Sequence, residues 1–127
     1  MKTAITIALI FLGVTLNAQA RLGSSRYDIL SEFYDSSPTV GVDNSGQVYI
    51  DVEFVRANVR YYLDKGGDCV LVFIMPKTQG DLNFYAEYYN NSYVILSSTS
   101  WKMYSTEGSI AKISLMSQDG VSIFVWQ

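Results

Sequence analysis

Alternation of apolar and polar positions between residues 48 and 54 is the clearest pattern in the chain. The even positions are apolar: Val48, Ile50, Val52 and Phe54. A period of two predicts a strand with one buried face. A second strand is predicted over 58–64. The run 69–75 is apolar at nearly every position, which is typical of a strand in the centre of a sheet.

The second half of the chain predicts further strands near 93–97, 100–105, 109–116 and 121–126. Gly-containing polar clusters separate the strands in both halves. These turns are Asp43-Asn44-Ser45-Gly46, Lys65-Gly66-Gly67-Asp68 and Ser117-Gln118-Asp119-Gly120. Lys65-Gly66-Gly67-Asp68 predicts a hairpin turn, because paired glycines permit positive φ at both central positions.

Two segments show helical spacing. Residues 25–35 place Ser25 and Asp28 at the spacing of a capping box, and Pro38 stops the pattern. Residues 79–90 follow the same design, with Thr78 and Asp81 in the capping positions. We therefore expect two short helices, each before a group of strands.

This order of elements predicts an α+β fold: a mostly antiparallel sheet of six to seven strands with two helices on one face. Short connections favour hairpins over parallel crossovers. A shift of 53 residues superposes Ser25 on Thr78, Gly67 on Gly120 and Val72 on Val125. Two tandem units of one helix plus three strands would explain this shift, and so would chance matching of common elements.

The first twenty residues have the design of a secretory signal peptide. Lys2 precedes an apolar run from residue 4 to residue 16, and Ala18-Gln19-Ala20 is a small-x-small cleavage site. The run is shorter than the roughly 20 residues that span a bilayer. We expect cleavage after Ala20, a single domain over 21–127, and a secreted or periplasmic location. Because Arg21 rather than a cysteine follows the site, we expect no stable membrane anchor after removal of the leader.

Composition narrows the chemistry that residues 21–127 can perform. The chain has no histidine, which removes the commonest general base and metal ligand, so we expect no cofactor, no metal and no enzyme activity. Cys69 is the only cysteine and lies in an apolar run, which indicates a buried thiol. Eight Lys and Arg against twelve Asp and Glu leave a net charge of −4, which disfavours nucleic acid as a partner.

Tyrosine is abundant, and neighbouring tyrosines such as Tyr61 and Tyr62 cannot both face one core. Some of these rings must therefore be exposed, and exposed Tyr and Trp are common where proteins meet partners. An alternative is that the rings only cover a small core. The candidate binding residues are Tyr61, Tyr62, Tyr88, Trp101 and Tyr104.

Carboxylates offer weaker candidates. Asp51 and Glu53 leave the polar face of one predicted strand, where they could serve acid–base chemistry or pair with Arg56 and Arg60 across the hairpin. Asp43, Asp64 and Asp68 could hold Ca²⁺, but their spacing is not that of a calcium loop, so polar turn chemistry is the simpler interpretation.

Residues 23–75 carry a resemblance to a known layout. The segments concerned are Gly23-Ser24-Ser25, Ile29, Phe33, Pro38 and Tyr61-Tyr62-Leu63-Asp64-Lys65-Gly66-Gly67. This helix-then-hairpin order resembles the SmpA/OmlA-type outer-membrane assembly lipoproteins. Doubled, it is similar to the β-lactamase inhibitory proteins, whose tandem α/β units present a concave sheet to a partner. The chain lacks the lipidated cysteine of the first family and the disulfides of the second, so the resemblance implies only an extracytoplasmic binding domain.

The function expected from these observations is non-enzymatic binding of another protein through an aromatic-bearing sheet face. The partner's identity and the oligomeric state are not contained in the sequence. The alternatives are a carbohydrate- or small-ligand-binding module and, less favoured, a small hydrolase that uses carboxylates alone.

Overall fold

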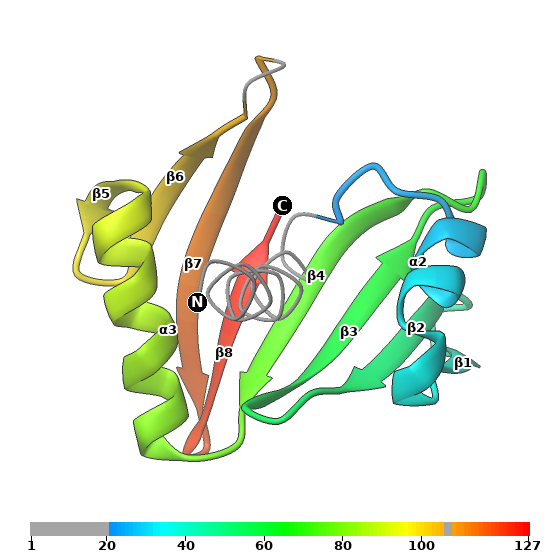
Figure 1. Ribbon diagram of the computed structural model, residues 1–127, viewed down its shortest axis with the longest axis horizontal. Helices are drawn as coiled ribbons and strands as arrows, with labels where there is room; N and C mark the ends of the chain where they lie inside the picture. The colour runs from blue at the N-terminus through cyan, green and yellow to red at the C-terminus, as the bar shows by residue number, and fades with distance from the viewer. Residues whose placement is uncertain (1–20, 106–107) are drawn as a thin grey trace, which may run out of the picture.

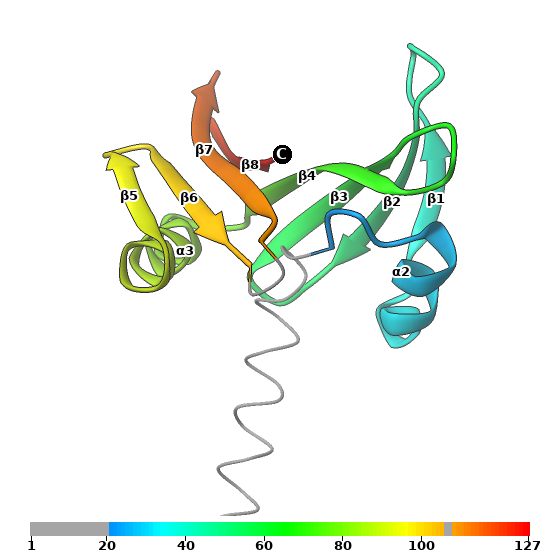
Figure 2. The same cartoon turned by 90° about the horizontal axis from the view of Figure 1, so that it is seen from above.

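The computed structural model describes residues 21–105 and 108–127. Their fold is α+β, with an open antiparallel sheet of eight strands in the order β1-β2-β3-β4-β8-β7-β6-β5 (Figure 1). Two α-helices lie on the same side of this sheet, one near each end (Figure 2). The predicted signal peptide, residues 1–20, lies outside the described residues.

The chain builds the sheet from two successive groups of elements. The first group is α2 (Arg26–Glu32), a 3-10 helix (Tyr34–Ser36), β1 (Thr39–Val42), β2 (Val48–Glu53), β3 (Ala57–Leu63) and β4 (Cys69–Pro76). The second group is α3 (Gln79–Ser92), β5 (Val94–Ser97), β6 (Ser100–Tyr104), β7 (Ile110–Gln118) and β8 (Val121–Trp126). Each group is thus a helix followed by a four-stranded meander.

The α+β class and the antiparallel sheet are confirmed, but the expected six to seven strands fall short of the eight that the sheet has. The strand that the sequence did not predict is β1, which gives the first group four strands, as many as were predicted for the second half. β1 has only four residues, one of them Gly41, and its valines are exposed. Its pairing with β2, and not a buried periodic face, makes it a strand.

Both predicted helix starts are confirmed. The Ser25 hydroxyl accepts a hydrogen bond from the amide of Asp28 at 3.2 Å, and the Thr78 hydroxyl accepts one from the amide of Asp81 at 3.1 Å. These side chains satisfy amides that a helix cannot pair internally in its first turn. The common shift of 53 residues therefore holds at the two N-caps.

The shift does not hold at the centre of the sheet, where β4 pairs with β8. Val72 lies opposite Trp126, and Phe73 lies opposite Val125. Val72 therefore faces the helices while Val125 faces away from them, so the predicted superposition of these two valines is wrong. Side chains in a strand alternate with a period of two, so the residues of β8 that share the face of Val72 are Phe124 and Trp126, on either side of Val125.

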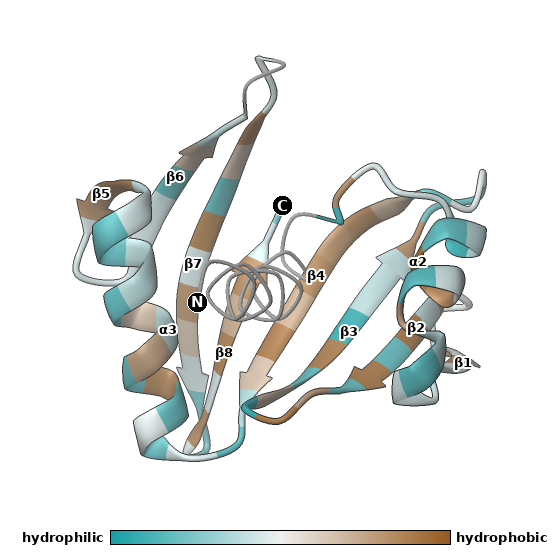
Figure 3. Ribbon diagram, in the orientation of Figure 1, coloured by the Kyte–Doolittle hydropathy of each residue, from teal (hydrophilic) through white to brown (hydrophobic). Residues whose placement is uncertain are grey.

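The predicted central position of the apolar run 69–75 is confirmed by the strand order. β4 is apolar along nearly all of its length, whereas β2 and β3 alternate between apolar and polar residues (Figure 3). Only three residue pairs join β4 to β8, from Val72–Trp126 to Ile74–Phe124. This short central ladder is the sole strand pairing between the two groups within the described residues.

One of the predicted turns has a different conformation. The predicted hairpin between β3 and β4 is present, but only Gly67 has a positive φ, of 85°, and Gly66 does not. Instead the turn spans 64–68, and the Asp64 carboxylate accepts hydrogen bonds from the amides of Gly66 and Asp68 at 2.9 and 3.0 Å. The turn needs a single left-handed residue, which glycine supplies without steric cost.

The same turn design occurs after β1. There the Asp43 carboxylate accepts from the amides of Ser45 and Gln47 at 2.9 and 3.0 Å, and Gly46 has a φ of 86°. The Ser45 hydroxyl also donates to Asp43 at 2.7 Å, and this bond, followed by the one from the Gln47 amide, holds the pKa of Asp43 below its usual value. Asp43 and Asp64 thus have the polar turn role that the sequence favoured over calcium binding.

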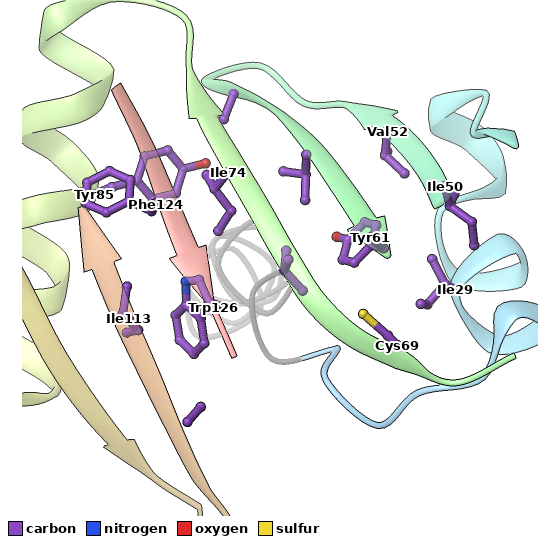
Figure 4. Close-up of a cluster of buried hydrophobic side chains, with 14 of the residues drawn as sticks. Ile29, Ile50, Val52, Tyr61, Cys69, Ile74, Tyr85, Ile113, Phe124 and Trp126 are labelled. Atoms are coloured by element: carbon purple, nitrogen blue, oxygen red, sulfur yellow. The ribbon is translucent and has the colours of Figure 1, made fainter. Parts of the chain in front are cut away.

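The main core lies between the sheet and its two helices (Figure 4). Ile29 of α2 packs near Ile50 and Tyr61, whereas Tyr85 of α3 packs beside Phe124. Cys69 belongs to this core and is buried, as predicted. The helices therefore cover one face of the sheet, and the other face carries no helix in the part of the chain that the structure describes.

Candidate binding surface

The sheet surface opposite the helices, here called the open face, has an apolar centre. Strand pairing places side chains of β4, β8 and β7 next to one another there, because directly paired residues point to the same side. We call this group the apolar strip; its members are Leu71, Phe73, Met75, Met116, Ile123 and Val125. Phe73 and Met75 are half-buried, Met116 is exposed and Val125 is buried, so the strip is accessible from solvent except at Val125.

An ion pair borders the strip on the side of β2 and β3. Arg60 donates to Asp51 through Nε at 2.7 Å and through Nη2 at 2.9 Å, in the two-pronged geometry that guanidinium groups favour. This pairing raises the pKa of the Arg60 guanidinium. Arg60 also lies over the ring of Tyr49, 3.7 Å from the ring centroid. The expected cross-strand pairing of Asp51 is therefore present.

Glycine at position 41 allows Tyr49 to occupy this place. A Cβ atom on Gly41 would lie 2.5 Å from ring atoms of Tyr49, closer than carbon atoms approach. Tyr62 continues the aromatic edge, since its ring contacts Phe73 edge-on at 5.1 Å between centroids. Arg60, Tyr49, Tyr62 and Phe73 thus form a contiguous group whose positions the sheet fixes.

Two lysines border the strip on its opposite side. Lys102 of β6 and Lys112 of β7 are directly paired, which places like charges side by side on one face. Neither forms an ion pair with any of the residues that the structure describes. The four ion pairs found there lie in the first group of elements or join it to α3. The open face is thus charge-paired on the β2–β3 side and cationic on the β6–β7 side.

The five predicted binding residues do not form one surface. Tyr62 is half-buried on the open face, and Tyr104 lies there with 58% of its surface exposed. Tyr88 lies on α3, on the opposite side of the sheet, where its ring packs edge-on against Tyr93. Tyr61 and Trp101 are 0% and 1% exposed and belong to the core.

The prediction that Tyr61 and Trp101 bind a partner is corrected by this burial. Tyr61 shares its face with Val59 and Leu63, and Trp101 is paired with the buried Ile113. Strand parity, not residue type, decides which aromatic ring reaches solvent. The expectation that neighbouring tyrosines divide between core and surface is nonetheless confirmed, because Tyr62 is partly exposed where Tyr61 is buried.

Sequence reasoning missed the apolar strip. The signal was present in the run 69–75: a strand that is apolar on both faces must present one of them to whatever lies opposite the helices. With helices on one side only, that second face of β4 lies on the open face.

Possible metal ligands and surface hollows are the remaining features of residues 21–105 and 108–127 that bear on a site. No group of three or more His, Cys, Asp or Glu side chains in this part of the chain could hold a metal ion. A hollow of about 570 Å³ lies between the two Asp–Gly turns and is lined by residues 45–48 and 63–65. Its carboxylate, Asp64, is already engaged by turn amides.

Comparison with known proteins gave no relatives: no family model, no curated protein and no solved structure matches this chain. Within the described residues, neither helix is long and apolar enough to cross a membrane.

Proposed function

We propose that this chain is a secreted or periplasmic, non-enzymatic binding protein that holds a partner protein against the open face. The apolar strip is the observation that carries the proposal. Leu71, Phe73, Met75 and Ile123 are only partly covered, although helices cover the equivalent positions on the other face. Contiguous exposed apolar surface on a small protein marks an interaction site more often than a solvated surface.

The polar residues that border the apolar strip support the proposal that the partner is a protein. Interfaces combine a desolvated apolar centre with a polar rim and are rich in Tyr, Met and Arg. Here Tyr62 and Arg60 lie on one side of the strip and Tyr104 and the two lysines lie on the other. The side chains belong to strands in a single sheet, so little conformational entropy is lost when they are covered.

The alternative of a carbohydrate-binding module is less well supported. Sugar rings stack on flat aromatic surfaces, but Tyr49 and Tyr62 meet at an interplanar angle of 64°. Tyr104 lies across the strip, since β4, β8 and β7 separate its strand from that of Tyr62. A carboxylate-based hydrolase is also less supported, because Arg60 pairs with Asp51 and Lys77 pairs with Glu53.

The partner can be sought by affinity capture with tagged protein comprising residues 21–127, from culture supernatant and periplasm. Met116→Asp places a charge on the exposed end of the strip, and Val55→Asp places the same charge in the β2–β3 loop, where Val55 is also exposed. We expect wild type and Val55→Asp to recover one protein in stoichiometric amount and Met116→Asp to lose it. Recovery of a glycan without a protein, or equal recovery by all three, would contradict the proposal.

A second pair of variants tests the aromatic rim. Tyr104→Ala removes an exposed ring from the open face, whereas Tyr34→Ala removes a more exposed ring from the 3-10 helix on the opposite side. We expect only Tyr104→Ala to weaken capture of the partner, by about tenfold, which corresponds to about 1.4 kcal/mol. Weakening by Tyr34→Ala instead would move the interface to the helical side.

A further inference from the structure

The outermost strand β5 differs from the rest of the surface in its exposure. Every residue of β5 is exposed, and Val94, Ile95 and Leu96 have 50%, 56% and 47% of their surface accessible. The sheet order ends at β5, so its outer backbone groups face no further strand within the described residues. An exposed apolar edge is a template on which another strand can pair.

The edge formed by β5 also lacks charged residues. Residues 88–101 contain no Asp, Glu, Lys or Arg, although the chain as a whole has a net charge of −3. Proteins usually protect an edge with lysine, proline or an inward-facing charge, and β5 has none of these. Two copies of an acidic chain repel one another over most of their surface, and this edge is a segment where that repulsion is weakest.

The opposite edge strand, β1, is better protected. It follows Pro38, which has no amide to donate, and it ends at Asp43. Its central residue, Gly41, offers no side chain, and Tyr49 of the neighbouring strand covers the place where one would be. β1 therefore provides a matched comparison, because it is an edge of the same sheet and of the same length but is less apolar and is followed directly by Asp43.

We propose that two copies of this chain associate through β5, antiparallel and about a two-fold axis at Ile95. In this arrangement Ile95 faces Ile95 of the second copy, and Val94 faces Leu96 of the second copy. The same apolar segment is then used on both sides, which is the condition for a closed two-fold interface. A foreign strand would need its own matching apolar, uncharged sequence, whereas a second copy supplies it by symmetry.

The contact is expected to be modest in strength. Cross-strand apolar pairs contribute roughly 0.2–1 kcal/mol each, and only four residues form the strand. A shift in the pairing of β5 with β6 between Ile95 and Ser97 limits the regular length further. The association therefore belongs to the weak class of interfaces and should depend on protein concentration.

Analytical ultracentrifugation of residues 21–127 over the micromolar range tests the proposal. We expect wild type and Val40→Lys to form a dimer as concentration rises, and Ile95→Lys to dimerise at least tenfold more weakly. Added salt should leave the dimer intact or strengthen it, since the contact carries no charge and salt screens the overall repulsion. A monomeric wild type at every concentration, or loss of the dimer in Val40→Lys but not in Ile95→Lys, overturns the proposal.

Disulfide trapping tests the position of the two-fold axis and does not depend on a destabilising charge. Directly opposite residues in an antiparallel pair have Cα atoms about 4.5–5.5 Å apart, within the range that a disulfide bridges. Ile95→Cys is expected to form a covalent dimer on mild oxidation, while Val40→Cys stays monomeric and the buried Cys69 stays unreacted. Equal cross-linking of both variants would indicate random collision and overturn the proposal. Neither outcome depends on whether the open face binds a partner, so the two proposals fail separately.

Discussion

The indole Nε1 of Trp101 donates a 2.8 Å hydrogen bond to Oδ1 of Asn90. This bond joins the middle of β6 to the last turn of α3 and satisfies the polar atom of a ring that is otherwise wholly in the core. Trp101 is therefore a structural residue whose one polar group is paired inside the molecule. The fold explains its position without any ligand.

Asn90→Ala should destabilise the protein through this indole. A buried donor left without an acceptor costs about 1–3 kcal/mol. Urea unfolding should show a lower midpoint for Asn90→Ala than for Asn91→Ala. Asn91 is the control, because it is the next residue of the same helix and is exposed like Asn90. Equal midpoints for the two variants would contradict a stabilising role for the Trp101–Asn90 bond.

Gly41→Ala should disturb the open face through Tyr49. The added methyl group meets the Tyr49 ring at 2.5 Å, so the ring must leave its place under Arg60. Overpacking of this kind costs about 1–3 kcal/mol. Gly80→Ala is the control, because its Cβ finds only an ordinary 3.7 Å contact in the first turn of α3.

The readout for this pair is the NMR spectrum of the Tyr49 ring together with the urea midpoint. We expect Gly41→Ala to shift the ring signals and lower the midpoint, and Gly80→Ala to be neutral or stabilising, since alanine is the better helix former. Unchanged Tyr49 signals in Gly41→Ala would show that the ring does not lie where the structure places it.

The glycines of the β3–β4 turn should respond unequally to substitution. Gly67 has a φ of 85°, a conformation that costs a non-glycine residue about 1–2 kcal/mol. Gly66 lacks this requirement, and a Cβ there meets only Asp64 Oδ1 at 3.4 Å. Thermal unfolding should therefore show a clear loss of stability for Gly67→Ala and little change for Gly66→Ala. Comparable losses for the two variants would instead indicate a turn in which both glycines have positive φ.

Alkaline pH should lower the stability of the protein, and ionisation of the Cys69 thiol should cause the first part of this loss. Burial raises the pKa of the Cys69 thiol from 9.0 to about 11 and that of Tyr85 from 10.0 to about 12. Between the lower and the higher value the unfolded chain has lost a proton that the folded chain retains. Stability is therefore fully present below about pH 9 and falls as the pH rises towards 11, by at most about 1.4 kcal/mol per pH unit for this one group.

Cys69→Ala isolates this contribution. The variant lacks the thiol, so its loss of stability should begin one pH unit higher, where the buried tyrosines start to ionise in the unfolded chain. Urea unfolding at a series of pH values from 8 to 11, a range set by the Cys69 shift, measures the difference. Parallel curves for wild type and Cys69→Ala between pH 9 and 10 would show that Cys69 is not buried in the folded state.

The fold was more predictable from the sequence than the binding surface. Local chemistry decides helix starts, so Ser25 and Thr78 could be identified as caps from spacing alone. The run 69–75 identified the centre of the sheet because a continuous apolar run is typical of a strand that has a neighbouring strand on each edge. β1 could not be found this way, because pairing with β2 rather than a periodic buried face stabilises it.

The surface required knowledge of which face each strand presents. Tyr61 and Tyr62 have the same side chain, yet one belongs to the core and the other to the open face. Lys102 and Lys112 lie side by side because their strands pair directly, and their spacing along the sequence does not reveal this. Residue type suggested the class of contact, and strand register decided which residues can make it.

The placement of β8 has a consequence for how the chain is made. β8 is the last strand in sequence, yet it lies beside β4 in the middle of the sheet. A polypeptide cut short of Val121 would leave the two-sided apolar strand β4 as a bare edge, ready to pair with other unfinished chains. The pairing of β4 with β8 joins residues that lie far apart in the sequence, and contacts of this kind slow folding. Assembly of this sheet should thus be an all-or-none event that waits for the synthesis of β8.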